Sequence, residues 1–408
     1  MKLQMVRDFP NNRFNWNNIK EDFYSRGNIS SYEKNDKIDY TVVGAGLSGC
    51  TFARKMAEVG KKILVIEKNK KIGGLCKDKK YSDYYVHEFG PHIFHTDYED
   101  VYLFLSNFTN FTNYKHRVMA DIDYGAVELV DGEQYVKFPV NINDWNLSEA
   151  EKLTLPNVKE ISLKELNDLG FGNIVNNIYV NVIENYSYKM WGKLVTLDDL
   201  AVNRIKVKLI KNDDSYFVDK YQGMPDKGYS NMMKKMLDHE NINLLVGKDF
   251  NEFIVNIGGK RIICPFIDKF DCSSAKIVYT GCVDDMCDET LPYVHTKFDF
   301  YESDRNFPTA VVNYPNKYKF TRTTDFRQFY SSKDASGIFV NEYPRDETGE
   351  RCYVVSDHYF YYDAISKSIN KEFDDRFYFL GRFGEYKYYD MDDSVKSAID
   401  LANKLRDA

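Results

Sequence analysis

The clearest pattern of hydrophobic positions in the chain runs from residue 40 to residue 74. β-Branched and apolar runs at 41–43 and 63–66 predict two buried strands, because parallel strands covered on both faces read as continuous apolar segments. Between them, residues 50–59 predict a helix. The order strand, glycine-rich turn, helix and strand predicts a βαβ unit that binds a dinucleotide.

Along the rest of the chain, the spacing of hydrophobic residues changes between the alternation of strands and the spacing typical of helices. Residues 114–130 and 134–140 alternate around the turn pair Asp131-Gly132, which predicts a hairpin. Residues 143–210 predict mostly helices, with Ser148 and Ser162 as N-caps. Residues 298–355 alternate and are rich in turns, which predicts antiparallel strands.

Two short apolar runs late in the chain, at 277–280 and 377–380, resemble the closing strands of a dinucleotide domain, and a helix is predicted over 390–405. The first unit of that domain therefore lies near the N-terminus and its last strand and helix at the C-terminus. This interrupted arrangement is common in FAD domains and unusual in NAD domains. We interpret residues 1–37 as an arm that is mobile or docked on the surface.

Composition narrows the class of function. The 408 residues carry 55 Lys and Arg against 62 Asp and Glu, a net charge of −7, and no basic tract, which argues against nucleic acid or an anionic membrane as a partner. No apolar run is long enough to span a membrane, so we expect no membrane insertion and a cytoplasmic location. The seven cysteines include no C-x-x-C pair, and we expect no metal site.

The glycine-rich turn supplies the first candidate chemistry. Gly44 permits the tight turn, Gly46 lets backbone amides approach a pyrophosphate, and Gly49 lets the helix pack close to the strand. The positive end of the helix points toward the anion, and Glu67 at the end of the next strand is placed to accept the ribose hydroxyls. The cofactor-binding residues expected in this part are Gly44, Gly46, Leu47, Ser48, Gly49, Glu67, Lys68, Gly74 and Leu75.

Longer motifs outside this unit are more specific. They include GPHIFHT at 90–96, YSYKMWG at 186–192, YFVDKYQGMPDKGY at 216–229, NEYPR at 341–345 and GRFGEYKYYDMDD at 381–393. On these segments, residues 38–408 resemble the UDP-galactopyranose mutase family. The resemblance implies an α/β protein with an interrupted Rossmann-like FAD-binding domain (38–97, 225–292 and 356–408), a helical bundle domain (98–112 and 142–210) and an antiparallel β-sheet domain (113–141, 211–224 and 293–355).

The family's reaction interconverts the pyranose and furanose forms of a nucleotide sugar, with UDP-galactopyranose and UDP-galactofuranose as the default pair. The resemblance implies FAD that must be reduced for activity, because N5 of the reduced flavin attacks the anomeric carbon without net redox. A homodimer is common in the family. Two other interpretations stay open: a flavin oxidoreductase of the amine-oxidase type, which shares the FAD halves, and a non-catalytic flavoprotein that binds a nucleotide.

The resemblance also assigns roles to single residues. Arg322 and Arg204 would hold the substrate diphosphate, since the planar guanidinium binds phosphate oxygens through two donors. The residues expected to be catalytic are Arg322, Arg204, His95 and His92, the two histidines lying beside the flavin. The expected substrate-binding residues are Tyr186, Trp191, Tyr216, Asn313, Arg322, Arg204, Tyr388, His116 and Val182. The expected cofactor-binding residues outside the first unit are His92, Ile93, Gly381, Arg382, Tyr388, Asp390 and Met391.

Two positions depart from the family. Val182 stands where a phenylalanine usually stacks on uracil, and Val354 stands where a phosphate-contacting tyrosine is common. Loss of a stacking face costs about 1–3 kcal/mol of base binding. Either a different or larger base, such as a purine, fills the space beside Val182, or neighbouring aromatic residues compensate and UDP binds. The sugar also stays open, with N-acetylgalactosamine, a deoxy sugar and a GDP-linked heptose as alternatives.

Overall fold

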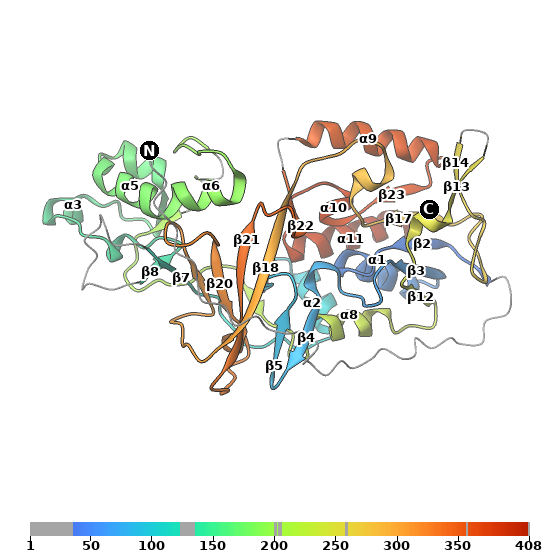
Figure 1. Ribbon diagram of the computed structural model, residues 1–408, viewed down its shortest axis with the longest axis horizontal. Helices are drawn as coiled ribbons and strands as arrows, with labels where there is room; N and C mark the ends of the chain where they lie inside the picture. The colour runs from blue at the N-terminus through green and yellow to red at the C-terminus, as the bar shows by residue number, and fades with distance from the viewer. Residues whose placement is uncertain are drawn as a thin grey trace.

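The computed structural model describes residues 36–122, 135–199, 202, 206–257, 260–355 and 358–406. The molecule is elongated, with a parallel sheet and its helices at one end, a large sheet in the middle and a group of short helices at the other end (Figure 1). Arg204, the turn pair Asp131-Gly132 and nearly all of the N-terminal arm lie outside the described residues.

A five-stranded parallel sheet forms one end of the molecule. Its strands lie in the order β12 (Ile242–Val246), β3 (Ile63–Glu67), β2 (Tyr40–Val43), β17 (Lys276–Tyr279) and β23 (Phe377–Phe379). All residues of β2 and β3 are buried, as their continuous apolar runs predict. Because the strands come from widely separated parts of the chain, the sheet confirms the interrupted Rossmann-like domain.

Helices cover both faces of this sheet. α1 (Leu47–Glu58) follows β2 directly and packs against α8 (Tyr229–Leu237) and α11 (Met391–Arg406). α9 (Tyr359–Glu372) packs against β23, and in Figure 1 it lies above the sheet while α8 lies below it. The carboxyl ends of β2 and β3 therefore meet the start of α1 at one edge, where open parallel sheets bind ligands.

A seven-stranded sheet forms the middle of the molecule. Its strands lie in the order β22 (Glu350–Val354), β18 (Tyr293–Ser303), β21 (Gly337–Pro344), β20 (Arg322–Asp325), β19 (Val311–Asn313), β7 (Val118–Asp121) and β8 (Tyr135–Phe138). Neighbouring strands are antiparallel except for β19 and β7. This confirms the antiparallel strands predicted for 298–355, and it confirms the hairpin predicted for 114–130 and 134–140 where β7 pairs with β8; residues 123–134 lie outside the described part of the chain.

Short helices form the other end. They are α3 (Glu149–Thr154), α4 (Leu163–Asp168), α5 (Gly172–Ile178), the π-helical turn η5 (Tyr179–Glu184) and α6 (Asn185–Trp191). Ser148 and Ser162 cap α3 and α4 through complete capping boxes, as predicted. The helical prediction for 143–210 is wrong at β9 (Glu160–Ser162) and β10 (Lys206–Lys208), which pair antiparallel and bury Ile161 against Val207.

Smaller elements connect these parts. The loop at 88–93 lies between two small sheets. Before it comes the hairpin of β4 (Asp78–Tyr81) and β5 (Tyr84–His87), and after it β6 (Phe94–Thr96) pairs with β11 (Tyr221–Gly223). The remaining elements are α2 (Glu99–Ser106), α10 (Gly381–Gly384), the sheet of β1 (Asp36–Lys37), β16 (Phe270–Asp271) and β15 (Phe266–Ile267), and the hairpin of β13 (Ile254–Ile257) and β14 (Lys260–Ile263).

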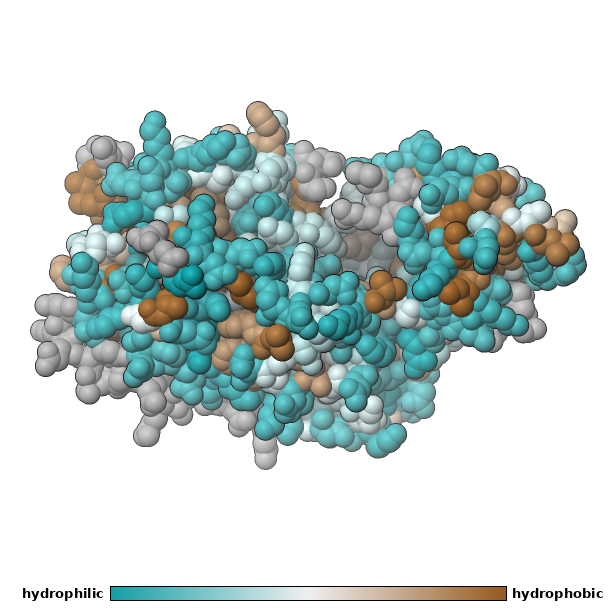
Figure 2. All heavy atoms as spheres, turned by 180° about the vertical axis from the view of Figure 1, so that it is seen from behind, coloured by the Kyte–Doolittle hydropathy of each residue, from teal (hydrophilic) through white to brown (hydrophobic). Residues whose placement is uncertain are grey.

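The surface is mostly hydrophilic when seen from behind, with hydrophobic residues gathered at the end that the short helices form (Figure 2). Exposed apolar side chains of this end include Leu153, Leu169 and Leu194. In the part of the chain that the structure describes, no helix is both long enough and apolar enough to cross a membrane.

Candidate functional site

A cavity of about 690 Å³ lies where β2, β3 and β17 end and α1 begins. This is the edge of a parallel sheet at which ligands bind, and the volume falls in the usual range for cofactor pockets. The predicted cofactor-binding residues on its wall are Gly44, Gly46, Leu47, Ser48, Glu67, Lys68, Gly74, Leu75, His92, Gly381, Arg382, Asp390 and Met391.

Gly44 and Gly49 shape the turn between β2 and α1. Gly44 has a φ of +100°, and a Cβ atom there would lie 2.2 Å from Thr280 Oγ1. A Cβ atom at Gly49 would lie 2.1 Å from the carbonyl oxygen of Gly44. Gly49 therefore permits close packing of helix on strand and does not itself lie on the cavity wall. The turn leaves the first amides of α1 open to an anion.

Glu67 ends β3 with its carboxylate turned back toward this turn. Its Oε2 accepts a hydrogen bond from the Ala45 amide at 2.8 Å, and its Oε1 accepts from the Asn69 amide at 2.8 Å and from the Asn69 side chain at 2.9 Å. An ionised carboxylate has about four acceptor positions. Glu67 can therefore hold the turn and still accept a hydroxyl from a ligand in the cavity.

Charged side chains of both signs line the cavity. The basic ones are Lys68, Lys71, Lys77, Lys248, Arg351 and Arg382, and the acidic ones are Glu67, Asp249, Asp285, Glu350 and Asp390. α1 has no acidic residue in its first turn, so nothing opposes the positive end of its dipole. The glycine turn, the helix start and these cations fit a pyrophosphate, and Glu67 fits a ribose. The residues present therefore fit the FAD that the sequence motifs imply.

His92 reaches the cavity from the loop between β5 and β6. Its Nδ1 lies 3.0 Å from the carbonyl oxygen of Gly90, and its amide donates to Nδ1 of His87 at 3.0 Å. Burial, together with the charges of Arg382 and Arg322, lowers the pKa of His92 to about 4. The ring is therefore neutral near pH 7. Because Nδ1–H donates to Gly90, Nε2 is left as a hydrogen-bond acceptor.

Arg322 on β20 lies at the centre of a second polar group. Its Nε donates to Glu342 Oε1 at 2.7 Å, and its Nη2 donates to the Tyr353 hydroxyl at 3.3 Å. Glu342 is almost fully buried, so the ion pair fixes the plane of the guanidinium. The Tyr353 ring in turn lies 5.6 Å from Cζ of Arg382, which is on the cavity wall, so this group adjoins the cavity.

Tyr186, Tyr216 and His116 face the same positive charge. Burial raises the pKa of Tyr186 and of Tyr216, and the charge of Arg322 opposes both shifts. Phe138 on β8 lies between the two tyrosines, with ring centroids 6.3 Å from Tyr186 and 6.1 Å from Tyr216. This aromatic group therefore brings together α6, β8 and the segment before β11.

Tyr353 and Tyr388 form a stack over Arg382. Their ring centroids lie 5.8 Å apart, and Cζ of Arg382 lies 5.6 Å from the first and 5.7 Å from the second. Nε of Arg382 donates to the carbonyl oxygen of Tyr389 at 2.8 Å. The Trp191 ring lies 6.5 Å from Tyr388. This stack connects the cofactor cavity to α6.

Some predicted residues lie elsewhere. His95 is not on the cavity wall: β6 pairs with β11, and the His95 ring stacks on Phe217 at 3.6 Å with its Nδ1 3.3 Å from Asp219 Oδ2. Ile93 is buried beside the cavity and not on its wall. Asn313 is buried in β19, opposite Arg322 in the register of the sheet.

Val182 belongs to the hydrophobic core and is 1% exposed. It lies in the π-helical turn η5, and such a turn adds a residue relative to an α-helix and rotates the side chains that follow. An ungapped alignment therefore does not predict which side chain faces the substrate. The structure shows Val182 packed in the core, four residues before Tyr186 on the same helical segment.

Three residues that build the site were missed by sequence reasoning: Tyr353, Glu342 and His87. In β22 the side chains of Cys352 and Val354 are buried, and Tyr353 between them reaches Arg322. One tyrosine hydroxyl of this strand therefore reaches Arg322 although Val354 has none, which the alternation of a strand could have indicated. Glu342 meets Arg322 because the register of β20 and β21 places them opposite each other.

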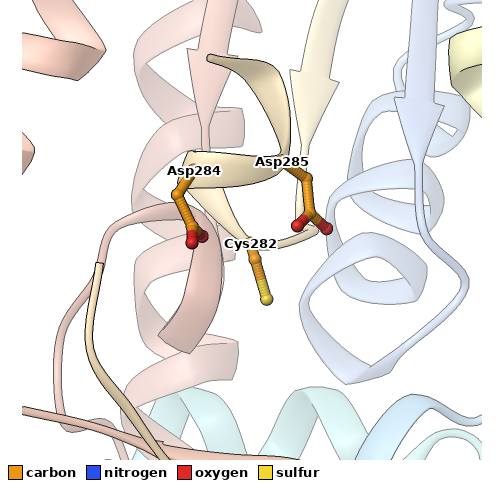
Figure 3. Close-up of side chains that lie close together, drawn as sticks. All are labelled: Cys282, Asp284 and Asp285. Carbon is orange, nitrogen blue, oxygen red and sulfur yellow. The ribbon is translucent and has the colours of Figure 1, made fainter. Parts of the chain in front are cut away.

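Cys282, Asp284 and Asp285 lie close together in the turn after β17 (Figure 3). Nη1 of Arg351 lies 3.0 Å from Asp285 and 3.5 Å from Asp284, and Asp284 also accepts from the Tyr293 hydroxyl at 2.7 Å. Burial raises the pKa of Cys282 to about 11, so the thiol keeps its proton. Arg351 already supplies the positive charge that a metal ion would bring, and the cluster contributes to the cavity wall.

Known proteins match most of the chain. A family model described as UDP-galactopyranose mutase matches residues 181–388, a little over half of the chain. A model of an NAD(P)-binding Rossmann-like domain matches residues 42–108. The UDP-galactopyranose mutase of Mycoplasma pneumoniae is 28% identical over 405 residues, which cover 92% of this chain and 98% of that protein.

A second curated protein and a solved structure are also similar to this chain. The dTDP-fucopyranose mutase of Escherichia coli is 28% identical over 393 residues, which cover 88% of this chain and 96% of that protein. A solved structure of reduced UDP-galactopyranose mutase aligns with a TM-score of 0.57 at 13% identity, over 90% of this chain and 95% of that one. The structural match shows the same fold.

Proposed function

The chain belongs to the UDP-galactopyranose mutase family, and on this premise we propose that it interconverts UDP-galactopyranose and UDP-galactofuranose with reduced FAD. The observation that carries the proposal is the position of Arg322, whose guanidinium is fixed by Glu342 and by Tyr353, and the Tyr353 ring also contacts Arg382 on the cavity wall. A fixed guanidinium at this place is suited to a diphosphate that must leave and return.

The cofactor would be held at the edge of the parallel sheet. Gly46, the start of α1 and Arg382 would bind its pyrophosphate, and Glu67 would bind its ribose. When bound and reduced, the flavin supplies a nucleophilic nitrogen, N5, for the anomeric carbon of the sugar. The protein's own contribution is to position the sugar, to hold the departing diphosphate and to exclude water.

The substrate would lie between the cavity and α6. Arg322 would bind the diphosphate, and the Tyr353 hydroxyl would orient the guanidinium. The aromatic group of Tyr186, Phe138 and Tyr216 offers faces for a pyrimidine base. His92, which is neutral and presents Nε2 as an acceptor, would accept a hydrogen bond on the cofactor side. The predicted role of Arg204 in binding the same diphosphate is part of this proposal.

A flavin oxidoreductase of the amine-oxidase type fits these residues less well. A cationic amine would be repelled by Arg322 and Arg382, both of which contact Tyr353. A nucleoside diphosphate carries the opposite charge and matches this pair of arginines. The charge of the site therefore favours the isomerase.

A second candidate substrate is a dTDP-linked deoxy sugar. The dTDP-fucopyranose mutase of Escherichia coli is as similar to this chain, at 28% identity, as the mycoplasmal UDP-galactopyranose mutase. Uracil and thymine differ by one methyl group, which a hydrophobic contact discriminates by roughly 10- to 200-fold. The sequence similarity alone does not separate the two substrates.

The test is product analysis by HPLC after incubation of the dithionite-reduced holoprotein with a panel of nucleotide sugars. The panel contains UDP-galactopyranose, UDP-N-acetylgalactosamine, dTDP-fucopyranose and a GDP-linked heptose. Furanose product from UDP-galactopyranose at the highest kcat/KM supports the proposal. A higher value for dTDP-fucopyranose selects the second candidate, and no furanose from any of them would overturn both.

A further inference from the structure

Lys189 is a partly buried cation that the proposed chemistry does not use. It lies on α6, three residues after Tyr186, so the two side chains share one face of the helix. Its Nζ donates to the carbonyl oxygen of Tyr314 at 2.6 Å and to that of Phe320 at 3.3 Å. Both carbonyls belong to the loop that joins β19 to β20.

This loop lies directly before Arg322, which belongs to the candidate site. Asn313 ends β19 immediately before it, and Arg322 begins β20 immediately after it. The loop is itself firmly packed, since Tyr314, Tyr318 and Phe320 form one aromatic cluster with ring centroids 4.9–5.1 Å apart. A tether between α6 and this loop therefore connects the helix to a rigid part of the sheet.

A second cation holds the other end of the helix. α6 ends at Gly192, which has a φ of +70° and donates its amide to the carbonyl oxygen of Tyr188. Nη1 of Arg345, which follows β21, lies 3.5 Å from the same oxygen. A Cβ atom at Gly192 would lie 2.4 Å from Cζ of Arg345, so the guanidinium occupies the place of a side chain. A cation at a helix C-terminus is favoured by the helix dipole.

Burial lowers the pKa of Lys189 to about 7. The tether does not depend on which form is present, because an ammonium has three N–H donors and an amine has two, enough for both carbonyls. Removal of the nitrogen, in contrast, leaves both carbonyl oxygens without this donor and leaves α6 with fewer bonds to the sheet.

We propose that Lys189 is a positioning residue that ties α6 to the β19–β20 loop and thereby keeps Tyr186 in place against Phe138, in the aromatic group that would bind the base. This inference rests on the proposed function, because it concerns binding of the nucleotide part of the substrate. Lys189 contacts the backbone of the β19–β20 loop, and would act on the substrate only through the placement of Tyr186 and of Trp191 at the end of the same helix.

The test compares Lys189→Met with Lys189→Arg and with Lys152→Met in the flavin-loaded protein. Lys152 is an exposed lysine of α3 and is the matched control for the loss of one charge. Hydrogen–deuterium exchange of residues 185–192 is measured without ligand, and the Kd of UDP and of dTDP is measured by calorimetry. Lys189→Gln replaces the methionine variant if that variant loses its flavin.

We expect Lys189→Met to speed exchange in 185–192 and to raise the Kd of the nucleotide that the wild type binds by about tenfold, as for loss of a hydrogen bond to a charged group. Lys189→Arg should restore most of the slow exchange and most of the nucleotide affinity, and Lys152→Met should change neither the exchange nor the Kd. Unchanged exchange, unchanged Kd or an arginine variant no better than methionine would each overturn the proposal. A wild type that binds neither nucleotide counts against the proposed function, while exchange still decides whether Lys189 holds α6.

Discussion

Nε of Arg322 lies 2.7 Å from Oε1 of the buried Glu342, and strand register places the two residues opposite each other on β20 and β21. The pair orients the guanidinium before any substrate binds. Arginine has five N–H donors, and those on Nε and Nη2 make the bonds to Glu342 and Tyr353. The geometry suits an arginine better than a lysine. The guanidinium can bind Glu342 and Tyr353 and still offer N–H donors of Nη1 to a phosphate, whereas a lysine has a single nitrogen for all of these contacts.

Replacement of Arg322 tests this role. We expect Arg322→Ala and Arg322→Lys each to lower kcat/KM by about 10²- to 10³-fold, the usual loss when a hydrogen-bonded charge partner is removed. The flavin should stay bound, because Arg322 is not on the cavity wall. Steady-state kinetics measures the fall in kcat/KM, and the flavin absorption spectrum shows whether the cofactor is retained. Arg117→Ala, which removes an exposed arginine, is the control; activity retained by Arg322→Ala would contradict the assignment.

The Tyr353 hydroxyl is expected to matter although the sequence did not single it out. Tyr353→Phe keeps the ring that stacks on Tyr388 and removes only the hydroxyl that accepts from Arg322. We expect kcat/KM to fall about tenfold or more, since a hydrogen bond to a charged group contributes about 1.5–3 kcal/mol. Tyr361→Phe, on an exposed tyrosine of α9, should have no effect. Equal activity of the two variants would show that Arg322 is oriented without Tyr353.

Retention of the cofactor depends on the turn between β2 and α1. Gly49→Ala would place a Cβ atom 2.1 Å from the Gly44 carbonyl oxygen, so the turn must open and the first amides of α1 must move. We expect the purified variant to contain little flavin. Gly172→Ala is the matched control, because its nearest neighbour would lie 3.6 Å away, which is an ordinary contact. Full flavin content in Gly49→Ala would mean that the turn does not hold the cofactor.

His116 makes stability depend on pH. Burial, with the charge of Arg322, lowers its pKa to about 3, against about 6.5 in an unfolded chain. Between these values the unfolded state binds the proton and the folded state does not, so stability falls as the pH falls through 6.5. From pH 7 to pH 5 this single group costs about 2 kcal/mol.

The comparison of His116→Gln with the wild type isolates that contribution. We expect the melting temperature of the flavin-loaded wild type to fall more between pH 7 and pH 5 than that of the variant. Other groups titrate in both proteins and cancel, including Asp78, whose pKa burial raises to about 6. Identical falls in melting temperature would show that His116 takes up its proton equally in the folded state.

Elements with a strong local signal could be predicted from the sequence. β2, α1 and β3 follow from apolar runs around a glycine turn, and the caps of α3 and α4 follow from Ser148 and Ser162 with a glutamate three residues later. The β9–β10 pair has no such signal, because its strands are three residues each and lie far apart in the chain. The π-helical turn η5 was also unpredictable, since it looks like ordinary helix in the pattern of residues.

The cofactor side of the site was easier to predict than the substrate side. The glycines and Glu67 act through backbone geometry that a short motif encodes. The partners of Arg322 come from β21 and β22, so they depend on strand register that no local pattern fixes. His95 illustrates the converse: it belongs to a specific motif, yet the pairing of β6 with β11 turns it toward Asp219.

The most direct test of the central claim is the number of product molecules formed per reducing equivalent. The holoprotein is reduced with a measured amount of dithionite without oxygen, and UDP-galactopyranose and dTDP-fucopyranose are added in separate reactions in large excess. NMR counts the furanose product, and absorbance follows the flavin. The account predicts many turnovers per flavin, with the flavin still reduced at the end. Product limited to one molecule per reducing equivalent, with the flavin oxidised, would contradict it.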